Sequence, residues 1–419
     1  MFAVVFYLAC LTIAPQLWIE PFIGWPTDYI SLILMFAALF ISGRIRNFLT
    51  LSSFDILLAA FAMWVTICAI KHGMTPAGEE KVIWYWKILL IVKTVEALVD
   101  NLDRLRQVTN WLILIAVILA IQAIQQKLDD VGLGWANQGR GWVDPIAAAA
   151  GEKGRSRWIG IFGGLGTSAV LFTSTYPLTL AYLNSHYGIT KKTLAASAAF
   201  LLLWAIYCTG SRGGLLAAMS VSSLYLMIRL RVSALAIALI TTIVVIFYAV
   251  APSHLTTVRD SSNSTQYRVE MWAAGLNMVK SNPVFGVGPG DFIRWTGKLI
   301  AHNSAIEVHG ELGFIGIIIW VAMIYLSLKS AIQFREVVPD EWKKWFAVGL
   351  ALSLIGHVVS SMFVTLEYET FYLLMTFCAV LNRCSANPAK LTTKDRYAIV
   401  GIICIWLVVL QYFVIAYFD

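Results

Sequence analysis

Apolar segments long enough to cross a bilayer recur along this whole chain, and they constrain its fold more than any other feature. A transmembrane helix needs about 17–25 predominantly apolar residues. Segments of this kind lie at 2–19, 28–42, 54–70, 82–99, 108–126, 158–183, 192–209, 212–229, 232–251, 312–334, 345–366, 370–383 and 397–417. Because the second and the twelfth are short, we predict about 12–13 transmembrane helices. The expected fold is an all-α polytopic membrane protein with a single membrane domain over residues 1–419.

The composition excludes an ordinary soluble enzyme. Of the 419 residues, 59% are hydrophobic and 13% are charged, and the mean hydropathy is +0.74. The first segment has no basic region before it and no small-residue cleavage site, so we expect it to be retained as a span. The six cysteines show no CxxC spacing, and neither a disulfide framework nor a zinc site is predicted.

Basic residues in the short loops predict the orientation, because Lys and Arg concentrate on the cytoplasmic side of a membrane protein. They fall on alternate sides of consecutive spans, and therefore on one side of the membrane: Arg44 and Arg46, Arg104 and Arg106, Lys191 and Lys192, Arg229 and Arg231, the segment 329–344 and the segment 383–396. The outer side then carries the loop 127–157, the large loop 252–311 and the break "TGSRGG" at 209–214. The net charge of +7 is spread over many loops, which does not indicate nucleic-acid binding.

The large loop 252–311 is predicted to have structure of its own. Its stretch "STQYRVEMWAAGLNMVKSNP" has apolar residues at helical spacing, namely Val269, Trp272, Ala273, Leu276 and Val279. Asn282–Pro283 should end this helix, and "GVGPGDF" should form a glycine-rich turn. We therefore expect an amphipathic helix along the membrane surface, with its apolar face toward the bundle.

Two arginines in outer segments are candidates for binding an anion. Arg212, in "CTGSRGGLLA", is either an anchor that snorkels to lipid headgroups or a receptor that grips phosphate oxygens with its planar fork. The glycines around it permit either a close ligand or a tight helix–helix turn. Arg268 lies four residues before Trp272 on one helix face, where it is a solvated or ring-stacked charge, or a second clamp on a diphosphate.

The stretch "AHNSAIEVHGELGFIG" places several titratable side chains before an apolar run. His302 and His309, with Glu307 and Glu311, suggest a metal site, but the spacing is not HExxH and no third strong ligand is evident, so no metal is predicted. A histidine just outside the membrane can act as a general base because its pKa lies near neutrality. His309 is better explained as a polar helix residue, and His357, within a span, by a buried hydrogen bond.

This stretch resembles the signature of the bacterial O-antigen ligase family, which is His, then Asn, Ser or Gln, nine arbitrary residues and two glycines three apart. The matching residues are His302, Asn303, Gly313 and Gly316. Three further features of the family are matched in the same order within 205–320: an "SRG" at an outer helix end by 211–213, an Arg followed by a Trp in a long outer loop by Arg268 and Trp272, and a "GxGxGxF"-like turn by 286–292.

The resemblance implies a metal-independent, GT-C-like glycosyltransferase of the bacterial inner membrane, with its active site facing the periplasm and no cofactor. Its donor would be a glycan on undecaprenyl diphosphate, and its acceptor a hydroxyl group, in the first place on lipid A–core. His302 would be the catalytic base, while Arg212 and Arg268 would bind the diphosphate. Asn303 and Glu311 would orient the histidine or bind sugar hydroxyls.

One segment departs from the family pattern. Relatives often have an Asn-containing run where this chain has "RWIGIFGGLGTSA" at 157–169. Arg157 fits that pattern and is kept as a supporting residue, as are His309 and Trp272. The Asn is missing, so the acceptor of this protein could differ from that of the relatives.

Other functions share these features. An O-antigen or exopolysaccharide polymerase would use a second lipid-linked repeat as acceptor, and a protein O-oligosaccharyltransferase would use a protein. A transporter of lipid-linked glycans or anions is the alternative from another class, and it should show midplane charges and inverted repeats. The distinctive residues instead cluster in outer segments and no repeat is evident, which favours an enzyme. The transporter hypothesis is retained because Lys87 and Lys93 lie within the span 82–99.

Overall fold

The computed structural model describes residues 1–129, 132–138, 154–184, 187–231, 258–297 and 300–418, and the regular elements in these residues are helices. The longer helices are α1 (Phe2–Ile13), α2 (Thr27–Ile41), α4 (Ser53–Lys71), α5 (Pro76–Leu98), α6 (Leu102–Leu128), α8 (Leu165–Leu183), α9 (Ile189–Thr209), α10 (Arg212–Leu230), α13 (Val258–Ser281), α15 (Ser304–Val337), α16 (Glu341–Ser361), α17 (Glu369–Arg383) and α18 (Thr393–Phe418). The shorter elements are α3 (Ile45–Leu49), α14 (Phe292–Thr296) and the 3-10 turns η1 (Pro15–Leu17) and η2 (Gly160–Phe162).

These helices confirm the predicted fold class. Each predicted span within the described residues overlaps a helix, whereas the one predicted at 232–251 lies outside them. Seven of the described helices are long and apolar enough to cross a membrane, by length and composition: α4, α6, α9, α10, α15, α16 and α18. The chain is therefore a polytopic helical membrane protein, and the total of about 12–13 spans stays a prediction.

The predicted span 158–183 becomes helical only at Leu165. The residues before it form η2 and fold back on the helix. Ser168 Oγ accepts a hydrogen bond from Trp158 N at 2.9 Å and donates one to Phe162 O at 2.6 Å. Ser168 thus pairs two backbone groups that a continuous helix would have paired internally. Because the residues before Leu165 are also apolar, hydropathy could not show where the helix begins.

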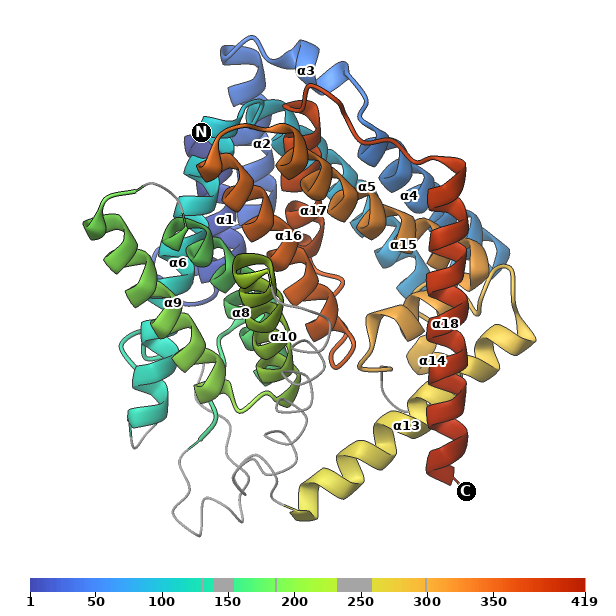
Figure 1. Cartoon of the computed structure of the whole chain (residues 1–419). Coiled ribbons are helices and arrows are strands. Elements are labelled where there is room, and N and C mark those ends of the chain that lie inside the picture. Colours follow the sequence, from blue (N-terminus) through green and yellow to red (C-terminus); the bar gives the residue numbers. More distant parts are fainter. Residues whose placement is uncertain (130–131, 139–153, 185–186, 232–257, 298–299, 419) are drawn as a thin grey trace.

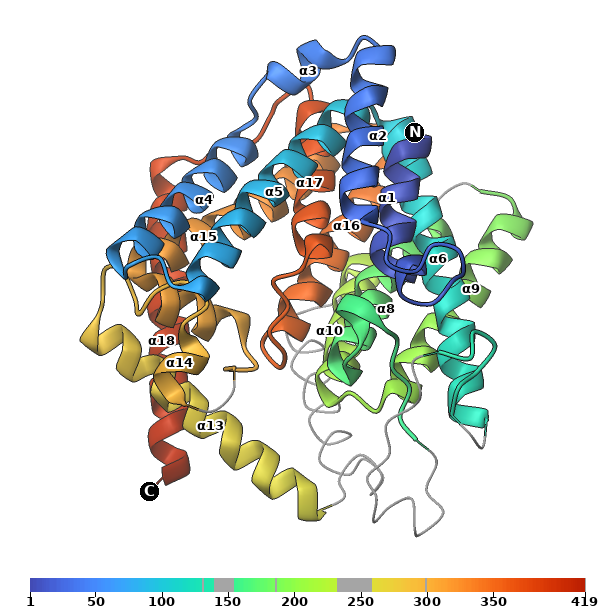
Figure 2. The same ribbon diagram turned by 180° about the vertical axis from the view of Figure 1, so that it is seen from behind.

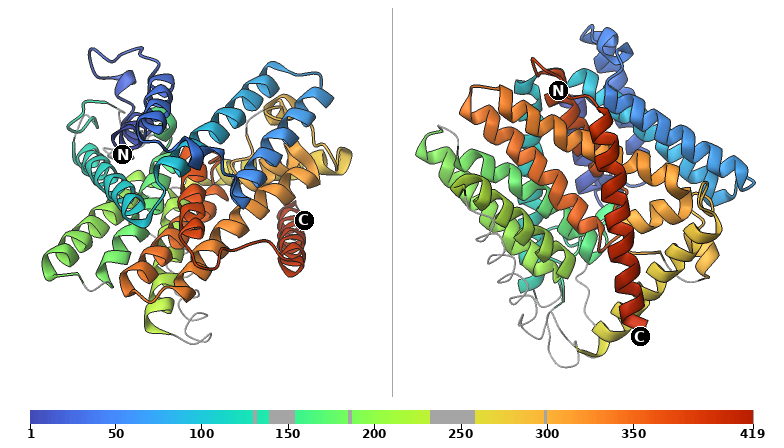
Figure 3. Two further views of the ribbon diagram at one scale, coloured as in Figure 1. Left: turned by 90° about the horizontal axis from the view of Figure 1, so that it is seen from above. Right: turned by 45° about the vertical axis from the view of Figure 1, so that its right-hand side comes forward.

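The helices are arranged around a central pair, α16 and α17 (Figure 1). The helices α1, α6, α8, α9 and α10 lie on one side of this pair, and α4, α5, α15 and α18 lie on the other (Figures 1 and 2). α8 packs against α9 and α16, and α15 packs against α4, α16 and α17. Their buried apolar side chains form one large core. α9 and α18 lie at opposite outer edges, as the view from above also shows (Figure 3).

The basic loops lie together at one end of the molecule. α3, the link between α5 and α6, and the link between α17 and α18 are at this end, which we call the basic end (Figure 1). Arg44 and Arg104 both pair there with Asp100, at 2.9 and 2.6 Å. α13 and the start of α10 are at the opposite end, which we call the α13 end (Figure 1). Three of the six predicted basic segments thus share one end of the molecule, and the side of the membrane on which this end lies stays a prediction.

The two lysines within α5 have acidic partners. Lys93 is 6% exposed, and its Nζ lies 2.6 Å from Asp55 Oδ2 and 3.7 Å from Glu96 Oε2. Lys87 Nζ lies 3.3 Å from Asp28 Oδ2. Because buried charges in membrane proteins are usually paired, these contacts explain how Lys93 is accommodated, and Lys87 pairs with an exposed carboxylate.

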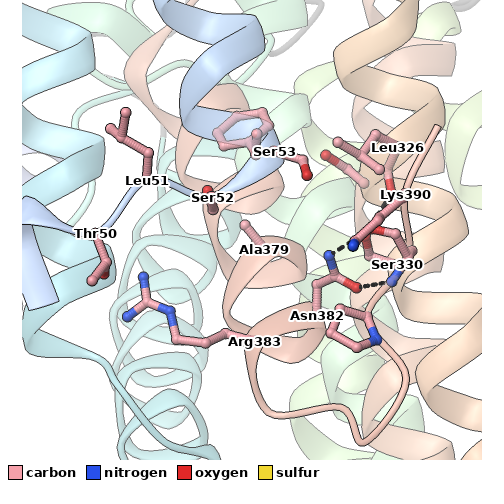
Figure 4. A pocket seen from close by; sticks show the side chains of 14 residues that line it. Thr50, Leu51, Ser52, Ser53, Leu326, Ser330, Ala379, Asn382, Arg383 and Lys390 are labelled. Atoms are coloured by element: carbon pink, nitrogen blue, oxygen red, sulfur yellow. Dashed lines mark hydrogen bonds between the residues drawn. The ribbon is translucent and has the colours of Figure 1, made fainter.

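A cavity of about 310 Å³ opens at the basic end between α4, α15, α17 and the link that follows α17 (Figure 4). Arg383 projects into it and pairs with the buried Glu96, with 2.5 Å between Nη2 and Oε1. Asn382 holds the link after α17 with two hydrogen bonds: its Nδ2 donates to Ala389 O, and its Oδ1 accepts from Ala389 N. The arginine of this cavity is thus neutralised within the protein, at the end opposite to the predicted catalytic residues.

Candidate active site

His302 lies two residues before α15, in a turn that is held in place by the hydrogen bonds of the adjacent residues Ala301 and Asn303. Asn303 caps the helix, because its Oδ1 accepts hydrogen bonds from the backbone N–H groups of Ala305 and Ile306 at 3.1 and 3.2 Å. Its Nδ2 also donates to Met362 O at 3.2 Å. His302 itself has a φ of +52°, a left-handed conformation that residues other than glycine rarely adopt. Ala14, Met74, Asn137 and Arg231 share this conformation, so the φ of His302 describes the turn and is not by itself a sign of function.

The helix predicted in the large loop is present as α13, and it ends at Ser281, next to the predicted stop. Its buried Val269 and Met278 pack with Phe292 of α14 and with α15 and α18 in a second, smaller apolar cluster. The apolar face of α13 therefore faces the bundle, as the spacing of its residues predicted.

α13 contacts the turn that carries His302. Trp272 Nε1 donates a hydrogen bond to Ala301 O at 3.1 Å, directly before the histidine. Arg268 lies one helical turn earlier on the same face of α13. Burial first, and then the positive charge of Arg268, lower the pKa of His302 below its usual value. At neutral pH the imidazole is therefore mostly uncharged and able to accept a proton.

Arg212 is the first residue of α10, at the α13 end. Ser211 caps this helix, since its Oγ accepts a hydrogen bond from Gly214 N at 3.1 Å. A Cβ added to Gly213 would lie 2.6 Å from the side chain of Phe363. The glycines beside Arg212 thus permit close packing, which is one of the two roles that the sequence allowed. Their presence gives no separate support to an anion site.

The loop after α16 contacts both halves of the site. Its first residue, Met362, accepts the hydrogen bond from Asn303, and the next, Phe363, lies against Gly213. The starts of α10 and α15 are therefore held by the same short loop. The predicted span 345–366 had included this loop, because Met362, Phe363 and Val364 are apolar. These side chains pack between helix ends. Hydropathy cannot distinguish apolar residues that are buried in a loop from apolar residues in a membrane helix.

The glycine-rich turn after α13 is docked on α15 by hydrogen bonds. The carboxylate of Glu311 accepts from Gly290 N at 2.7 Å and from Phe292 N at 3.2 Å. Gly288 N donates to the carbonyl of Glu311 at 3.0 Å. Gly286 has a φ of +64°, and a Cβ there would lie 2.2 Å from the carbonyl carbon of Glu311. In this structure Glu311 therefore holds the turn in place.

α15 is broken at Gly313, a glycine of the signature, whose φ of 67° and ψ of −166° are not helical. The backbone groups on either side of the break have partners outside the helix. Trp64 Nε1 donates to Leu312 O at 2.9 Å, and Phe314 N donates to Pro283 O at 2.8 Å. The break is thus supported by hydrogen bonds from outside the helix, which pair two of the backbone groups next to it.

Gly313→Ala should strongly destabilise the protein, because the added Cβ would lie 2.2 Å from Val284 O. Gly297 is a matched control with a φ of +64° and no heavy atom within 4 Å of the added Cβ. Alanine at Gly297 should cost roughly 1–2 kcal/mol for the left-handed backbone alone. At Gly313 the cost should be larger for two reasons. The added Cβ overlaps Val284 O, and the φ and ψ of this residue lie in a region that is essentially restricted to glycine.

The yield of monodisperse protein after detergent extraction, and its melting temperature, measure the difference between the two variants. Equal losses would contradict the close approach of Gly313 and Val284.

A comparison with protein families links this geometry to a known group. Residues 197–321 match the family described as O-antigen ligase. This match supports the O-antigen ligase-like superfamily for the chain. The matched segment includes Arg212, Arg268 and His302, and it ends within α15. A comparison with curated proteins found no match. The general function is therefore that of an O-antigen ligase or polymerase, which places this membrane protein among glycosyltransferase-like enzymes.

His309 and His357, the other two histidines weighed in the sequence analysis, are packed in the interior of the protein. His309 is 1% exposed, with its ring 4.7 Å from that of Phe314 and 5.8 Å from that of Trp406. His357 makes a buried hydrogen bond through Nε2 to Leu366 O at 3.2 Å. Within the described ranges, no group of three or more His, Cys, Asp or Glu side chains could hold a metal ion. His309 thus serves packing here, and His302 is the histidine placed beside an arginine of the predicted site.

Arg157 lies beside the end of α6, where its backbone N–H donates to Gln126 Oε1 at 2.9 Å. The side chain of the neighbouring Arg155 lies against Gly210. A Cβ on Gly210 would be 2.9 Å from Arg155 Cδ, in the turn that leads to Arg212. Arg155 was not among the predicted residues, because the family pattern pointed to Arg157.

Proposed function

We propose that the protein transfers a glycan from undecaprenyl diphosphate to an acceptor hydroxyl, and that it acts as an O-antigen ligase on lipid A–core. The family match supports the general class. The observation that carries the reaction is the half-buried imidazole of His302, beside Arg268 and directly before a candidate membrane span. This site lies opposite the basic end, which supports a position on the periplasmic face of the bacterial inner membrane.

His302 would serve as the general base. Its uncharged nitrogen would take the proton from the acceptor hydroxyl as the oxygen attacks the anomeric carbon, and the bond from that carbon to the diphosphate oxygen would break. Negative charge grows on the departing diphosphate, and Arg212 and Arg268 would stabilise it. The arginine fork suits this role because it binds two phosphate oxygens at once and keeps its charge at any relevant pH.

The rate of transfer should fall as the pH drops through the pKa of His302, because the protonated ring cannot act as a base. Burial and Arg268 lower that pKa, so the fall should come below the usual value of 6.5. Arg268→Gln removes one of these causes and should move the acid limb to higher pH, whatever the loss in maximal rate. Transfer rates between about pH 5 and 8 measure this shift. An acid limb at the same pH in both proteins would argue against His302 as the base.

The polysaccharide on the cell surface distinguishes a ligase from a polymerase. In a strain without the protein, a ligase predicts that all long-chain glycan disappears from lipid A–core while lipid-linked polymer accumulates. Collapse of the glycan to single repeats would instead assign polymerisation. Complementation with the wild-type chain and with a His302 variant shows whether the proposed site is responsible, provided that both are present in the membrane at equal levels.

A further inference from the structure

A groove of about 530 Å³ lies between α6, α8 and α9, near the basic end of the molecule and far from the candidate active site. α9 is at the outer edge of the molecule (Figures 1 and 3), and α6 and α9 are both candidate membrane spans. The groove is therefore placed where lipid surrounds the protein. We propose that it binds one phospholipid with an anionic headgroup, from the leaflet at the basic end.

Two basic side chains line the groove at the start of α6 and the start of α9. Lys191 Nζ lies 5.0 Å from the centre of the Tyr187 ring. Arg106 lies 5.0 Å above the ring of Trp342 and 3.2 Å from Asp103 Oδ1. The side chain of Asp103 is 74% exposed, and exposed ion pairs contribute little, so this pair leaves Arg106 able to bind a phosphate. The groove thus has a cationic end at the level of the basic loops.

Tyrosines follow the basic residues along the groove. The rings of Tyr182 and Tyr187 stack with their centroids 5.1 Å apart. The hydroxyl of Tyr182 donates a hydrogen bond to Asn110, which holds this ring across the gap between α8 and α6. Tyrosine favours the boundary between headgroups and acyl chains because it is apolar at one end and polar at the other.

Apart from Thr179, the rest of the lining is apolar, and much of it is open. Leu114 and Val117 of α6 face Leu194 and Ala198 of α9 in this groove, and Leu114 and Leu194 are 47% and 67% exposed. From Arg106 to Val117 the helix rises about 16 Å. That length matches one leaflet, which is half of a hydrocarbon core about 30 Å thick. A charged end followed by an apolar wall one leaflet deep fits a phospholipid, and a small free anion would leave most of this wall uncovered.

Native mass spectrometry of the full chain in mixed micelles tests the proposal. Phosphatidylglycerol and phosphatidylethanolamine with the same acyl chains are titrated in parallel, and the wild-type protein should prefer the anionic lipid. Each basic residue near an anionic headgroup contributes about 1 kcal/mol, or about fivefold. The double variant Arg106→Gln/Lys191→Gln should therefore lose up to about 25-fold in affinity for phosphatidylglycerol.

Lys192→Gln is the matched control, because this lysine is adjacent to Lys191 on α9 but does not line the groove. It should keep the preference for phosphatidylglycerol. Ala198→Trp should fill the apolar part and weaken binding of both lipids, and the melting temperatures of all variants show whether they are folded.

Three results would overturn the proposal: a double variant that keeps the wild-type preference, a Lys192→Gln variant that loses the preference equally, or complete displacement of the lipid by glycerol phosphate. The first two would assign binding to general surface charge, and the third to a site for small anions. Because the groove is at the basic end, none of these results bears on the proposed glycosyl transfer.

Discussion

Replacement of His302 by asparagine should abolish glycan transfer without changing the amount of folded protein in the membrane. Asparagine tolerates a left-handed backbone, so it should accept the φ of +52° at this position. Its amide cannot take a proton at neutral pH, and loss of a general base lowers rates by about 10²–10⁴-fold. Transfer is measured in membranes that lack the wild-type chain, with lipid-linked donor and lipid A–core added.

His309→Phe is the control for this experiment. It should preserve the ring packing against Phe314 and Trp406, and it should keep most of the activity. A His302→Asn protein with the wild-type rate would refute the assignment of the base. So would a His309→Phe protein that is folded but as inactive as His302→Asn.

Arg212→Lys and Arg268→Lys should each lower the rate of transfer on the order of a hundredfold, by analogy with the loss of one donor from an oxyanion hole. Lysine keeps the charge but not the planar fork that binds two oxygens of a diphosphate. Inhibition by free undecaprenyl diphosphate should weaken as well, because the same arginines would hold the product. The two measurements together distinguish lost diphosphate binding from a general loss of structure.

Arg294→Lys is a suitable control for both arginines. Arg294 is on α14, in the same large loop, and its side chain is 73% exposed and 3.9 Å from Asp291. It should retain the wild-type rate. If Arg294→Lys loses as much activity as the other two variants, transfer does not depend specifically on Arg212 and Arg268. Wild-type rates in Arg212→Lys and Arg268→Lys would remove the diphosphate site altogether.

The sequence was sufficient to predict those parts of the fold that depend on local patterns. Hydropathy predicted the fold class, because each membrane helix needs its own apolar run. The spacing of Val269, Trp272 and Val279 predicted an amphipathic helix, since its period is that of an α-helix. The family signature directed attention to His302, whose surroundings could not be inferred from the pattern alone.

Contacts between distant parts of the chain could not be predicted. Trp64 of α4 hydrogen-bonds to Leu312 of the neighbouring helix α15, 248 residues later in the chain, and this bond supports the break in α15. The loop after α16 was taken for part of a span because its side chains are apolar. Its contacts with Asn303 and Gly213 are set by tertiary packing, and nothing in a single sequence encodes which helix starts will meet.

The break at Gly313 also determines the direction in which the first residues of α15 carry His302 away from the apolar segment. If the first nine residues of α15 continued the line of the helix, they would raise the imidazole by about 13 Å beyond the predicted span. They are instead turned against the segment 283–290. A polyprenyl diphosphate could then react where its phosphates leave the bilayer. The sugar acceptor would have to descend to that level, and the donor lipid would not have to be lifted out of the membrane.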